Sequence, residues 1–504
     1  SLRVLMLGWE FPPFITGGLG TACYGLTRAM SRMGMEVTFV LPKQIDPSYA
    51  SHVRLISPGE PRPEDAAGFP TAAPFCVEPQ PGAPEPPGGL HGIDRSASSG
   101  VTAEGRLSIL GPLATPEPRR SESSVYGPGG LSSRLGSLIA VSRHRRLLQH
   151  SLRAMDAETL ERELALYEAV PEASAAPAFD SEADITPPPT RSDYEGDLIG
   201  QAERYARFCA KVSKTLDFDV IHAHDWLTYP AGLAVARLTG KPLVCHIHST
   251  EFDRSGEHVN QPVYNIERRG MHGAVRVIAV SMLTKNLCVN RYGVSPDKID
   301  VVYNGVDLDP RAVGIAGIEK GDRIVLYFGR ITMQKGPEDF IQAAKKVLDV
   351  MDDVKFVVAG SGDQAQRMIE MAAALGIGSK VLFTGFLRGK DMPRAFSMAD
   401  LYVMPSVSEP FGIAPLEAMS HRVPVLISRT SGVSEILVNA LKCNFWDVSD
   451  MANKIVAVLR YPPLQNTLRD HGYFEVRGIN WDGAARRCET IYRRALGAMN
   501  HAAH

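Results

Sequence analysis

Two glutamates on either side of a Pro/Gly turn are the residues whose types and spacing most directly indicate chemistry. They lie in the run Pro405-Ser406-Val407-Ser408-Glu409-Pro410-Phe411-Gly412-Ile413-Ala414-Pro415-Leu416-Glu417-Ala418-Met419. Glycine permits a sharp bend, and Pro415 suits the first turn of a helix. We therefore expect Glu409 on a loop after a strand and Glu417 one turn into a helix. The free N–H groups of Gly412 and Ile413 at that helix start favour an anion. Two carboxylates beside an anion site suit a ligand that carries hydroxyls and phosphate, such as a nucleotide-sugar.

A pair of cations provides the complementary charge. Arg330 and Lys335 lie in the run Phe328-Gly329-Arg330-Ile331-Thr332-Met333-Gln334-Lys335-Gly336, directly after an apolar segment. Arginine binds phosphate through two parallel hydrogen bonds, and lysine adds a compact charge. The spacing predicts a phosphate site, and an exposed pair without function is the alternative.

A glycine-rich loop near the start of the chain offers backbone donors. Gly17 and Gly18 lie between an apolar strand and a helix, where N–H groups can approach a phosphate. A dinucleotide fingerprint is excluded because Cys23 occupies its third glycine position. No G-K-[ST] triplet is present, which excludes a Walker loop. A tight turn without ligand remains the alternative.

Histidines and an aspartate follow two further apolar segments. His222 and His224 precede Asp225, while His246 precedes His248 by two positions. Alternation in a strand places His246 and His248 on one face, so His248 at the strand end is expected to reach a ligand. A His/Asp pair could bind a metal, but no third or fourth ligand is spaced suitably along the chain, and we expect no metal. Asp225 as a structural cap and His248 as a satisfied hydrogen-bonding residue are the alternatives.

The elements that would position these residues alternate between apolar strands and helices, which indicates α/β units with parallel sheets. The first unit has a helix expected near residues 21–33 and strands at 3–7, 36–41, 219–223, 242–247 and 275–280. The second has strands expected at 323–328, 354–359, 380–384, 401–404 and 424–427. Two doubly wound units that face each other leave a central cleft at the carboxyl ends of their strands, where ligands bind.

Residues 57–195 interrupt this alternation. The segment is rich in Pro, Gly, Ala and Ser, a composition that buries too little apolar surface to offset the entropy of ordering. We interpret it as an insertion in the first unit, with an amphipathic helix near 147–169 and a second helix from about 193 to 216. A disordered decoration and an acceptor- or partner-binding arm are both compatible with it.

Composition sets the class of protein. The 504 residues are 44% hydrophobic and 22% charged with a net charge of −2, which is typical of a globular protein and gives no indication of nucleic-acid binding. Seven cysteines without a C-x-x-C pair predict reduced thiols and a cytoplasmic protein. No apolar run reaches the ~18 residues that span a bilayer.

Together these motifs resemble those of retaining GT-B glycosyltransferases, in particular the glycogen and starch synthase-like members. The resemblance covers nearly the whole chain except residues 57–195. It implies an acceptor-side Rossmann-like domain at 1–308, a nucleotide-sugar domain at 309–480, and a last helix within 481–504 that crosses back to the first domain. One departure is Ile15, where many starch synthase-like enzymes carry lysine.

The resemblance also implies roles for individual residues. Arg330 and Lys335 would hold the diphosphate, with Gly17, Gly18 and Gly329 near the donor. Glu409 would bind donor-sugar hydroxyls and Glu417 the ribose. His248 would bind the sugar 6-hydroxyl, and Asp225 would lie near a sugar. The segment at Phe386 would read the base through backbone groups, and no metal or other cofactor would be required.

The expected activity is transfer of glucose from ADP- or UDP-glucose to the non-reducing end of an α-1,4-glucan. Hexosyl transfer to a small-sugar or lipid-linked acceptor is the first alternative. A nucleotide-sugar 2-epimerase and a glucan-binding protein with an inactive site are the others. Donor base, acceptor length and oligomeric state are not determined by the sequence.

Overall fold

A computed structural model describes residues 1–12, 18–43, 51–58, 197–308, 321–387 and 391–501. The predicted insertion at 57–195 lies almost entirely outside these residues, including the helix expected near 147–169. Gly17 and Ile15 of the glycine loop lie outside them as well.

The first half of the chain forms a parallel sheet with the strand order β3-β2-β1-β4-β5-β6-β7. Its strands are β1 (Arg3–Leu7), β2 (Glu36–Val40), β3 (Arg54–Ile56), β4 (Val220–His224), β5 (Leu243–Ile247), β6 (Arg276–Ala279) and β7 (Ile299–Val301). The sequence predicted the five inner strands to within two residues at either end. It missed β3 and β7, because three residues at a sheet edge are too short to show a period.

Helices cover both faces of this sheet. They are α1 (Gly18–Arg32), α5 (Leu198–Val212), α6 (Tyr229–Thr239), α7 (Glu251–Ser255), α8 (Gln261–Gly273) and α9 (Met282–Tyr292). Leu5 and Leu7 of β1 join the core with α5, α6 and α8, while Val4 and Met6 join the core with α1. Helix α1 begins three residues earlier than expected, so Gly18 belongs to its first turn. Glycine weakens helix interiors, but a helix start tolerates it.

The second half forms another parallel sheet with the order β10-β9-β8-β11-β12-β13. Its strands are β8 (Arg323–Phe328), β9 (Val354–Ala359), β10 (Val381–Gly385), β11 (Leu401–Met404), β12 (Val425–Ser428) and β13 (Leu441–Cys443). Its helices are α10 (Pro337–Leu348), α11 (Ala365–Ala374), α12 (Asp391–Met398), α13 (Ala414–Ser420), α14 (Val448–Arg460) and α15 (Pro462–Val476). Two apolar cores, one on each face of this sheet, confirm a doubly wound arrangement. Strand β13, again three residues at an edge, was not predicted.

Five short 3-10 helices complete the described elements: η4 (Ser213–Thr215), η5 (Pro296–Lys298), η7 (Met333–Lys335), η8 (Gly378–Lys380) and η9 (Gly432–Glu435). The six cysteines in the described part of the chain are unpaired and buried. No described helix combines the length and the apolarity needed to cross a bilayer.

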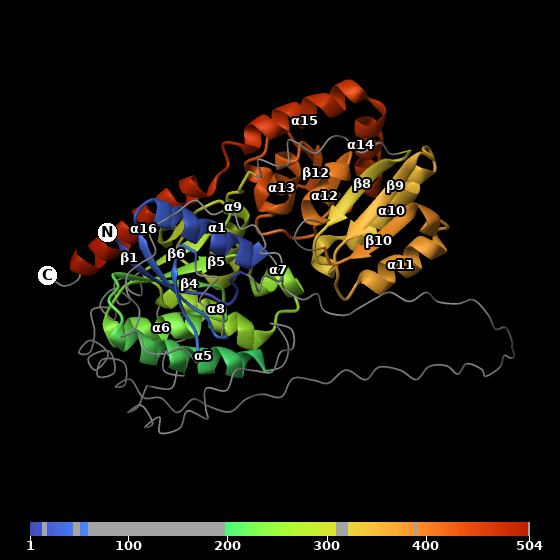
Figure 1. Cartoon of the computed structure of the whole chain (residues 1–504). Coiled ribbons are helices and arrows are strands. Elements are labelled where there is room, and N and C mark those ends of the chain that lie inside the picture. The colour runs from blue at the N-terminus through green and yellow to red at the C-terminus, as the bar shows by residue number, and fades with distance from the viewer. Residues whose placement is uncertain (13–17, 44–50, 59–196, 309–320, 388–390, 502–504) are drawn as a thin grey trace, which may run out of the picture. The chain divides into compact units, whose positions relative to one another are not determined.

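The last helix, α16 (Trp481–His501), lies beside α1 of the first half, as the red and blue helices of Figure 1 show. Trp481, Cys488 and Tyr492 are buried in the same apolar core as Val4 and Met6. The Trp481 ring occupies the space beside Gly25 of α1, where an added Cβ would lie 2.3 Å from the ring. A residue without a side chain at position 25 is therefore required for this contact.

Replacing the two partners of this contact should give coupled losses of stability. Trp481→Ala empties a buried site and should lower the free energy of unfolding by about 3–5 kcal/mol. Gly25→Ala should cost about 1–3 kcal/mol through the clash with the ring. In the double variant the clash is gone, so the combined loss should be smaller than the sum by roughly 1 kcal/mol or more.

Chemical denaturation of the four proteins measures this coupling. Gly497→Ala in α16, the helix that carries Trp481, is the matched control, because an added Cβ there meets no atom within 4 Å. It should be neutral or slightly stabilising, by up to ~1 kcal/mol. Strictly additive losses for Gly25→Ala and Trp481→Ala would contradict the packing described.

Candidate functional site

The loop after β8 and the loop after β11 bring the predicted cation and carboxylate together. Lys335 Nζ forms an ion pair with Glu409 Oε2, and both side chains are largely removed from solvent. Ser406 Oγ donates to the same carboxylate oxygen at 3.2 Å. Because partial burial makes an unpaired charge costly, each of the two charges depends on the other.

Main-chain contacts hold these two loops at this spacing. The Val407 N–H donates to the Gln334 carbonyl at 2.9 Å, and Gln334 Nε2 donates to the Ser408 carbonyl at 3.0 Å. Gly336, which has φ of 64°, begins α10 at the point of closest approach. A Cβ at Gly336 would lie 2.0 Å from the Pro405 carbonyl oxygen, so only glycine fits there. The glycine that follows Lys335 is thus a packing requirement of the ion pair.

Arg330 lies on the same β8 loop but has a different environment. Its side chain is exposed, and its guanidinium has no hydrogen-bond or ion-pair partner among the described residues. The loop itself is fixed, because the Ile331 N–H donates to the Ser361 carbonyl at 2.9 Å. Added Cβ atoms at Gly360 and Gly362 would lie 1.8 Å and 2.2 Å from carbonyl oxygens of the β8 loop. A rigid loop thus presents a cation that is free to bind an anion.

The second glutamate of the motif lies in α13, as the sequence predicted. Glu417 is half-buried, and its carboxylate has no hydrogen-bond or ion-pair partner among the described residues. Burial raises the pKa of Glu417 to about 7. Gly412 has φ of 98°, and an added Cβ would lie 3.1 Å from Glu409 Cγ. The N–H groups of Gly412 and Ile413 are likewise unpaired within the described part of the chain.

Two further predicted contacts with the donor lie at strand ends. Phe386 directly follows β10 and is about half exposed at 49%. Gly329 directly follows β8 and has φ of 144°. Gly18 is exposed at the first position of α1, whereas Gly17 is not among the described residues. The binding roles of all four glycine and aromatic positions remain predictions.

Asp225, which follows β4, holds the end of β5. Its backbone is in the left-handed region, with φ of 57°. Asp225 Oδ1 accepts hydrogen bonds from the His248 N–H at 2.7 Å and the Ser249 N–H at 3.4 Å. Burial raises the pKa of Asp225 to about 7, although these hydrogen bonds act in the opposite direction. The carboxylate therefore acts first as a support for the strand end that carries His248.

His248 lies at the end of β5 and contacts a second histidine. His248 Nε2 and His224 Nδ1 are hydrogen-bonded at 2.9 Å. Burial lowers the pKa of His248 to about 3, so the imidazole is neutral near pH 7. A neutral ring can donate or accept a hydrogen bond with a sugar hydroxyl, which is the role predicted for it.

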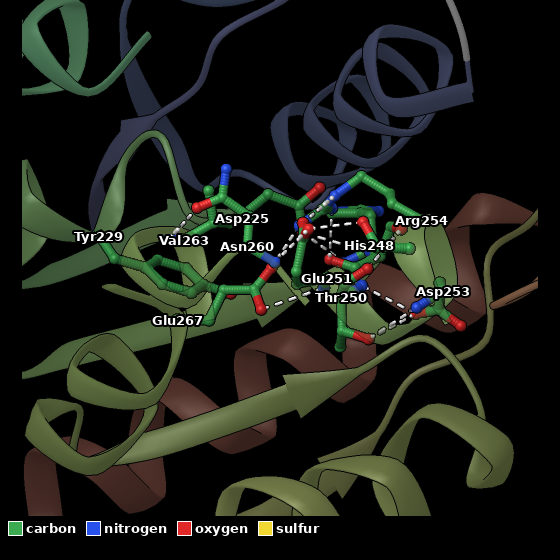
Figure 2. Close-up of polar contacts among 12 residues, drawn as sticks. Asp225, Tyr229, His248, Thr250, Glu251, Asp253, Arg254, Asn260, Val263 and Glu267 are labelled. Carbon is green, nitrogen blue, oxygen red and sulfur yellow. Dashed lines mark hydrogen bonds and ion pairs between the residues drawn. The ribbon is translucent and has the colours of Figure 1, made fainter. Parts of the chain in front are cut away.

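Figure 2 shows a polar network next to Asp225 and His248, in which the partly exposed Arg254 contacts buried carboxylates. Arg254 Nη2 donates to Glu267 Oε1 at 2.5 Å, and Arg254 Nε donates to Glu251 Oε2 at 3.1 Å. The Glu251 N–H in turn donates to Glu267 Oε2 at 3.1 Å. Each carboxylate is thereby compensated within the protein. The segment from Glu251 to Glu267 is thus built on internal pairs.

One contact that the sequence did not predict joins this network to the run of residues 405–419 that carries Glu409 and Glu417. Ser408 Oγ donates to Asp253 Oδ1 at 2.6 Å. The other carboxylate oxygen of Asp253 accepts from the Thr250 N–H and hydroxyl, each at 2.8 Å, which caps α7. Serine and aspartate at such spacing are common in loops, so no sequence signal distinguished them.

Spacing along the chain did not indicate a third imidazole close to His222 and His224. His222, His224 and His246 offer nitrogen atoms that all lie within 4.8 Å of one another. The sequence argument considered spacing along the chain, whereas the parallel register of β4 and β5 places His224 directly beside His246, with His222 on the same face. Asp217 and Asp219, two aspartates separated by one residue, form ion pairs with Arg3, and Asp307 forms an ion pair with Arg28.

Comparisons with known proteins identify the class. Three family models match: "Starch synthase catalytic domain" over residues 3–62, "Glycosyltransferase Family 4" over 167–310 and "Glycosyl transferases group 1" over 311–473. An uncharacterized glycosyltransferase of Methanocaldococcus jannaschii is 30% identical over 306 residues, which cover 56% of this chain and 77% of that protein. The glycogen synthase of Mycobacterium tuberculosis is 28% identical over 285 residues, 55% of this chain and 69% of that protein.

Solved structures share the fold. Sucrose-phosphate synthase from Thermosynechococcus elongatus aligns with a TM-score of 0.62 at 15% identity and covers 99% of this chain and 100% of that one. Anabaena Alr3699/HepE in complex with UDP-glucose aligns with a TM-score of 0.56 at 16% identity, over 97% and 99% of the two chains. Two parallel-sheet α/β domains with these neighbours define a GT-B fold. The chain belongs to the GT-B glycosyltransferases and is similar to the glycogen and starch synthases.

The Lys335–Glu409 pair gives the first test of the site. Lys335→Ala removes a positive charge from the proposed reacting centre, and Glu409→Ala removes the negative charge that is paired with it. Each variant should therefore lower kcat by about 10²–10³-fold. Steady-state kinetics of nucleoside diphosphate release provides the measurement.

A surface pair of the same kind serves as the matched control. Lys345 pairs with Asp349 on α10, where both side chains are substantially exposed. Lys345→Ala should leave kcat within about twofold, since exposed pairs contribute little. Turnover within a few-fold of wild type for Lys335→Ala would contradict the site.

The raised pKa of Asp225 predicts a pH-dependent stability difference. Because the folded pKa of about 7 lies above the ordinary value of 3.8, the native state retains this proton while the unfolded chain has lost it. This contribution to wild-type stability is complete below about pH 4 and is lost as the pH rises to 7. The unfolding free energy of Asp225→Asn minus that of wild type should rise over this window, by at most about 1.4 kcal/mol per pH unit. It should level off above pH 7.

Urea unfolding of both proteins at several pH values from 4.5 to 8 measures this difference. A difference that stays constant, or that falls as the pH rises, would show that Asp225 is ionised throughout this range in the folded protein.

Proposed function

We propose that the protein is a retaining hexosyltransferase that moves glucose from ADP- or UDP-glucose to the non-reducing end of an α-1,4-glucan. One observation carries the proposal. The segments after β8 and β11, strands that are paired in the sheet, carry a lysine–carboxylate pair together with an arginine and a carboxylate that have no partner among the described residues. Such a set matches a ligand with a diphosphate at one position and hydroxyls on both sides of it.

Each described group has a distinct part in the proposed reaction. Arg330 binds the diphosphate, since its guanidinium is exposed and unpaired within the described residues. Lys335 adds a second positive charge where negative charge develops on the leaving group. Glu417 accepts from the ribose hydroxyls, because its carboxylate has no partner among the described residues.

Glu409 has two parts. It holds Lys335 in place before the donor binds, and it faces the donor-sugar hydroxyls once the diphosphate shares the lysine. Fixed cations thus take the place of a metal at the diphosphate. The proposed attack of the acceptor on the same face as the leaving group gives retention, and the departing phosphate oxygen accepts the proton of the acceptor hydroxyl.

The glucan acceptor is supported by relatives. The glycogen synthase of Mycobacterium tuberculosis is 28% identical to this chain, and the starch synthase model matches its first residues. A second candidate, a small-sugar or lipid-linked acceptor, has similar support. D-inositol 3-phosphate glycosyltransferases are 28–30% identical, and an Escherichia coli galactosyltransferase named for a diphosphoundecaprenol substrate is 27% identical.

Release of nucleoside diphosphate tests donor and acceptor together. ADP-glucose and UDP-glucose are each incubated with and without glycogen or maltooligosaccharide, in a brief assay that contains EDTA. We expect release that depends on glucan and proceeds without added metal. Product NMR then reports the anomeric configuration, and an α-linked product is expected.

Two results would overturn the proposal. No glucan-dependent release from either donor would remove the polymer assignment and direct the search to small-sugar and lipid-linked acceptors. Conversion of UDP-N-acetylglucosamine to its C2 epimer in the absence of any acceptor would indicate an epimerase instead.

A further inference from the structure

Four histidines on one face of β4 and β5 form a cluster that the proposed transfer uses only at its edge. His222, His224, His246 and His248 stack in pairs, with ring centroids 4.3 Å apart for the first two and 4.2 Å apart for the last two. His222, His224 and His246 are fully buried. Such a concentration of imidazoles in an apolar core calls for a partner that uses their lone pairs.

Two nitrogen atoms in the cluster lack a partner. His224 Nε2 and His246 Nε2 are buried and make no hydrogen bond. An unsatisfied polar atom in a core costs about 1–3 kcal/mol, and an ion is one of the groups that satisfies it. The unpaired atoms belong to two of the three residues whose nitrogens lie within 4.8 Å of one another.

The remaining nitrogens carry the contacts that orient metal-binding imidazoles. His222 Nδ1 is hydrogen-bonded to the Tyr492 hydroxyl of α16, and His224 Nδ1 to His248 Nε2. In His224 this contact leaves Nε2 available, whereas His222 Nε2 is within hydrogen-bond distance of His246 Nδ1. A metal-bound histidine usually has its second nitrogen fixed in this way.

The spacing also fits a tetrahedral ion. His222 Nε2 and His246 Nδ1 lie within hydrogen-bond distance at 3.1 Å, so an ion bound to both atoms would take the place of the proton between them. Zinc–nitrogen bonds of ~2.0 Å place two tetrahedral ligands roughly 3.3 Å apart.

We propose that His222, His224 and His246 bind one Zn²⁺ ion, with water in the fourth position. The ion lies behind the donor site and ties β4, β5 and α16 together. It fixes His224, and through the bond between His224 and His248 it orients the imidazole at the donor. Its part is structural and separate from the diphosphate, whose charge is met by Arg330 and Lys335.

Binding of Co²⁺, the spectroscopic substitute for zinc, tests the site in the full-length, tag-free protein. After removal of bound metal, titration with Co²⁺ should give visible d–d bands that saturate at one ion per chain, and Zn²⁺ should abolish them. X-ray absorption of the zinc form should report three imidazole nitrogens at about 2.0 Å. These two measurements need no variant, so they decide the proposal even if a histidine substitution unfolds the protein.

Variants then assign the ligands. His246→Asn should weaken Co²⁺ binding by at least about 100-fold, and Tyr492→Phe, which keeps the packing but removes a partner of His222, by about 10–100-fold. His258→Asn is the matched control, because His258 is exposed and outside the cluster. It should bind Co²⁺ as wild type does.

Other outcomes would overturn the proposal. These are no bound metal at one equivalent in wild type, equal affinity in His246→Asn and wild type, or a zinc spectrum without imidazole ligands. A crystallographic water between the rings with no bound metal would identify water as the buried partner instead. Nucleoside diphosphate release remains a separate readout, so this inference and the proposed transfer can fail independently.

Discussion

Parallel strand order is the constraint on which the site depends. In each sheet every strand runs in the same direction, so all carboxyl ends lie at one edge. Asp225 follows β4, His248 follows β5, Arg330 follows β8 and Glu409 follows β11. Residues far apart in the chain therefore meet without any motif that links them in sequence. The loops supply the chemistry, and the buried strands determine where each loop begins.

Within that arrangement, the second sheet balances its charges in a way that suits an anionic donor. Lys335 is paired with Glu409, so a partly buried cation is held in place without ligand. Arg330 and Glu417 are free of partners among the described residues. The guanidinium can therefore bind an anion, and the carboxylate can accept hydrogen bonds. A diphosphate brings the charge that Arg330 lacks, and ribose hydroxyls bring the donors that Glu417 lacks. Under the proposed function, the Lys335–Glu409 pair is in place before the donor binds.

The sequence predicted the inner strands because they are apolar runs. It predicted the strand-end residues because Gly and Pro residues near Arg330 and Glu417 mark loops and helix starts. It missed edge strands of three residues, which have no period to detect. It also missed the Ser408–Asp253 bond and the alignment of His246 with His224, because neither has a pattern in sequence. Such contacts arise from the register between strands and from loop packing, which only the folded chain determines.

The central claim is that the edge of the second sheet holds a nucleoside diphosphate. A crystal structure with UDP or ADP bound tests it most directly. The account predicts a diphosphate within hydrogen-bond distance of Arg330 and Lys335, with the ribose hydroxyls bonded to the carboxylate of Glu417. A nucleotide bound elsewhere, or a ribose that leaves Glu417 without contact while the diphosphate avoids both cations, would contradict it.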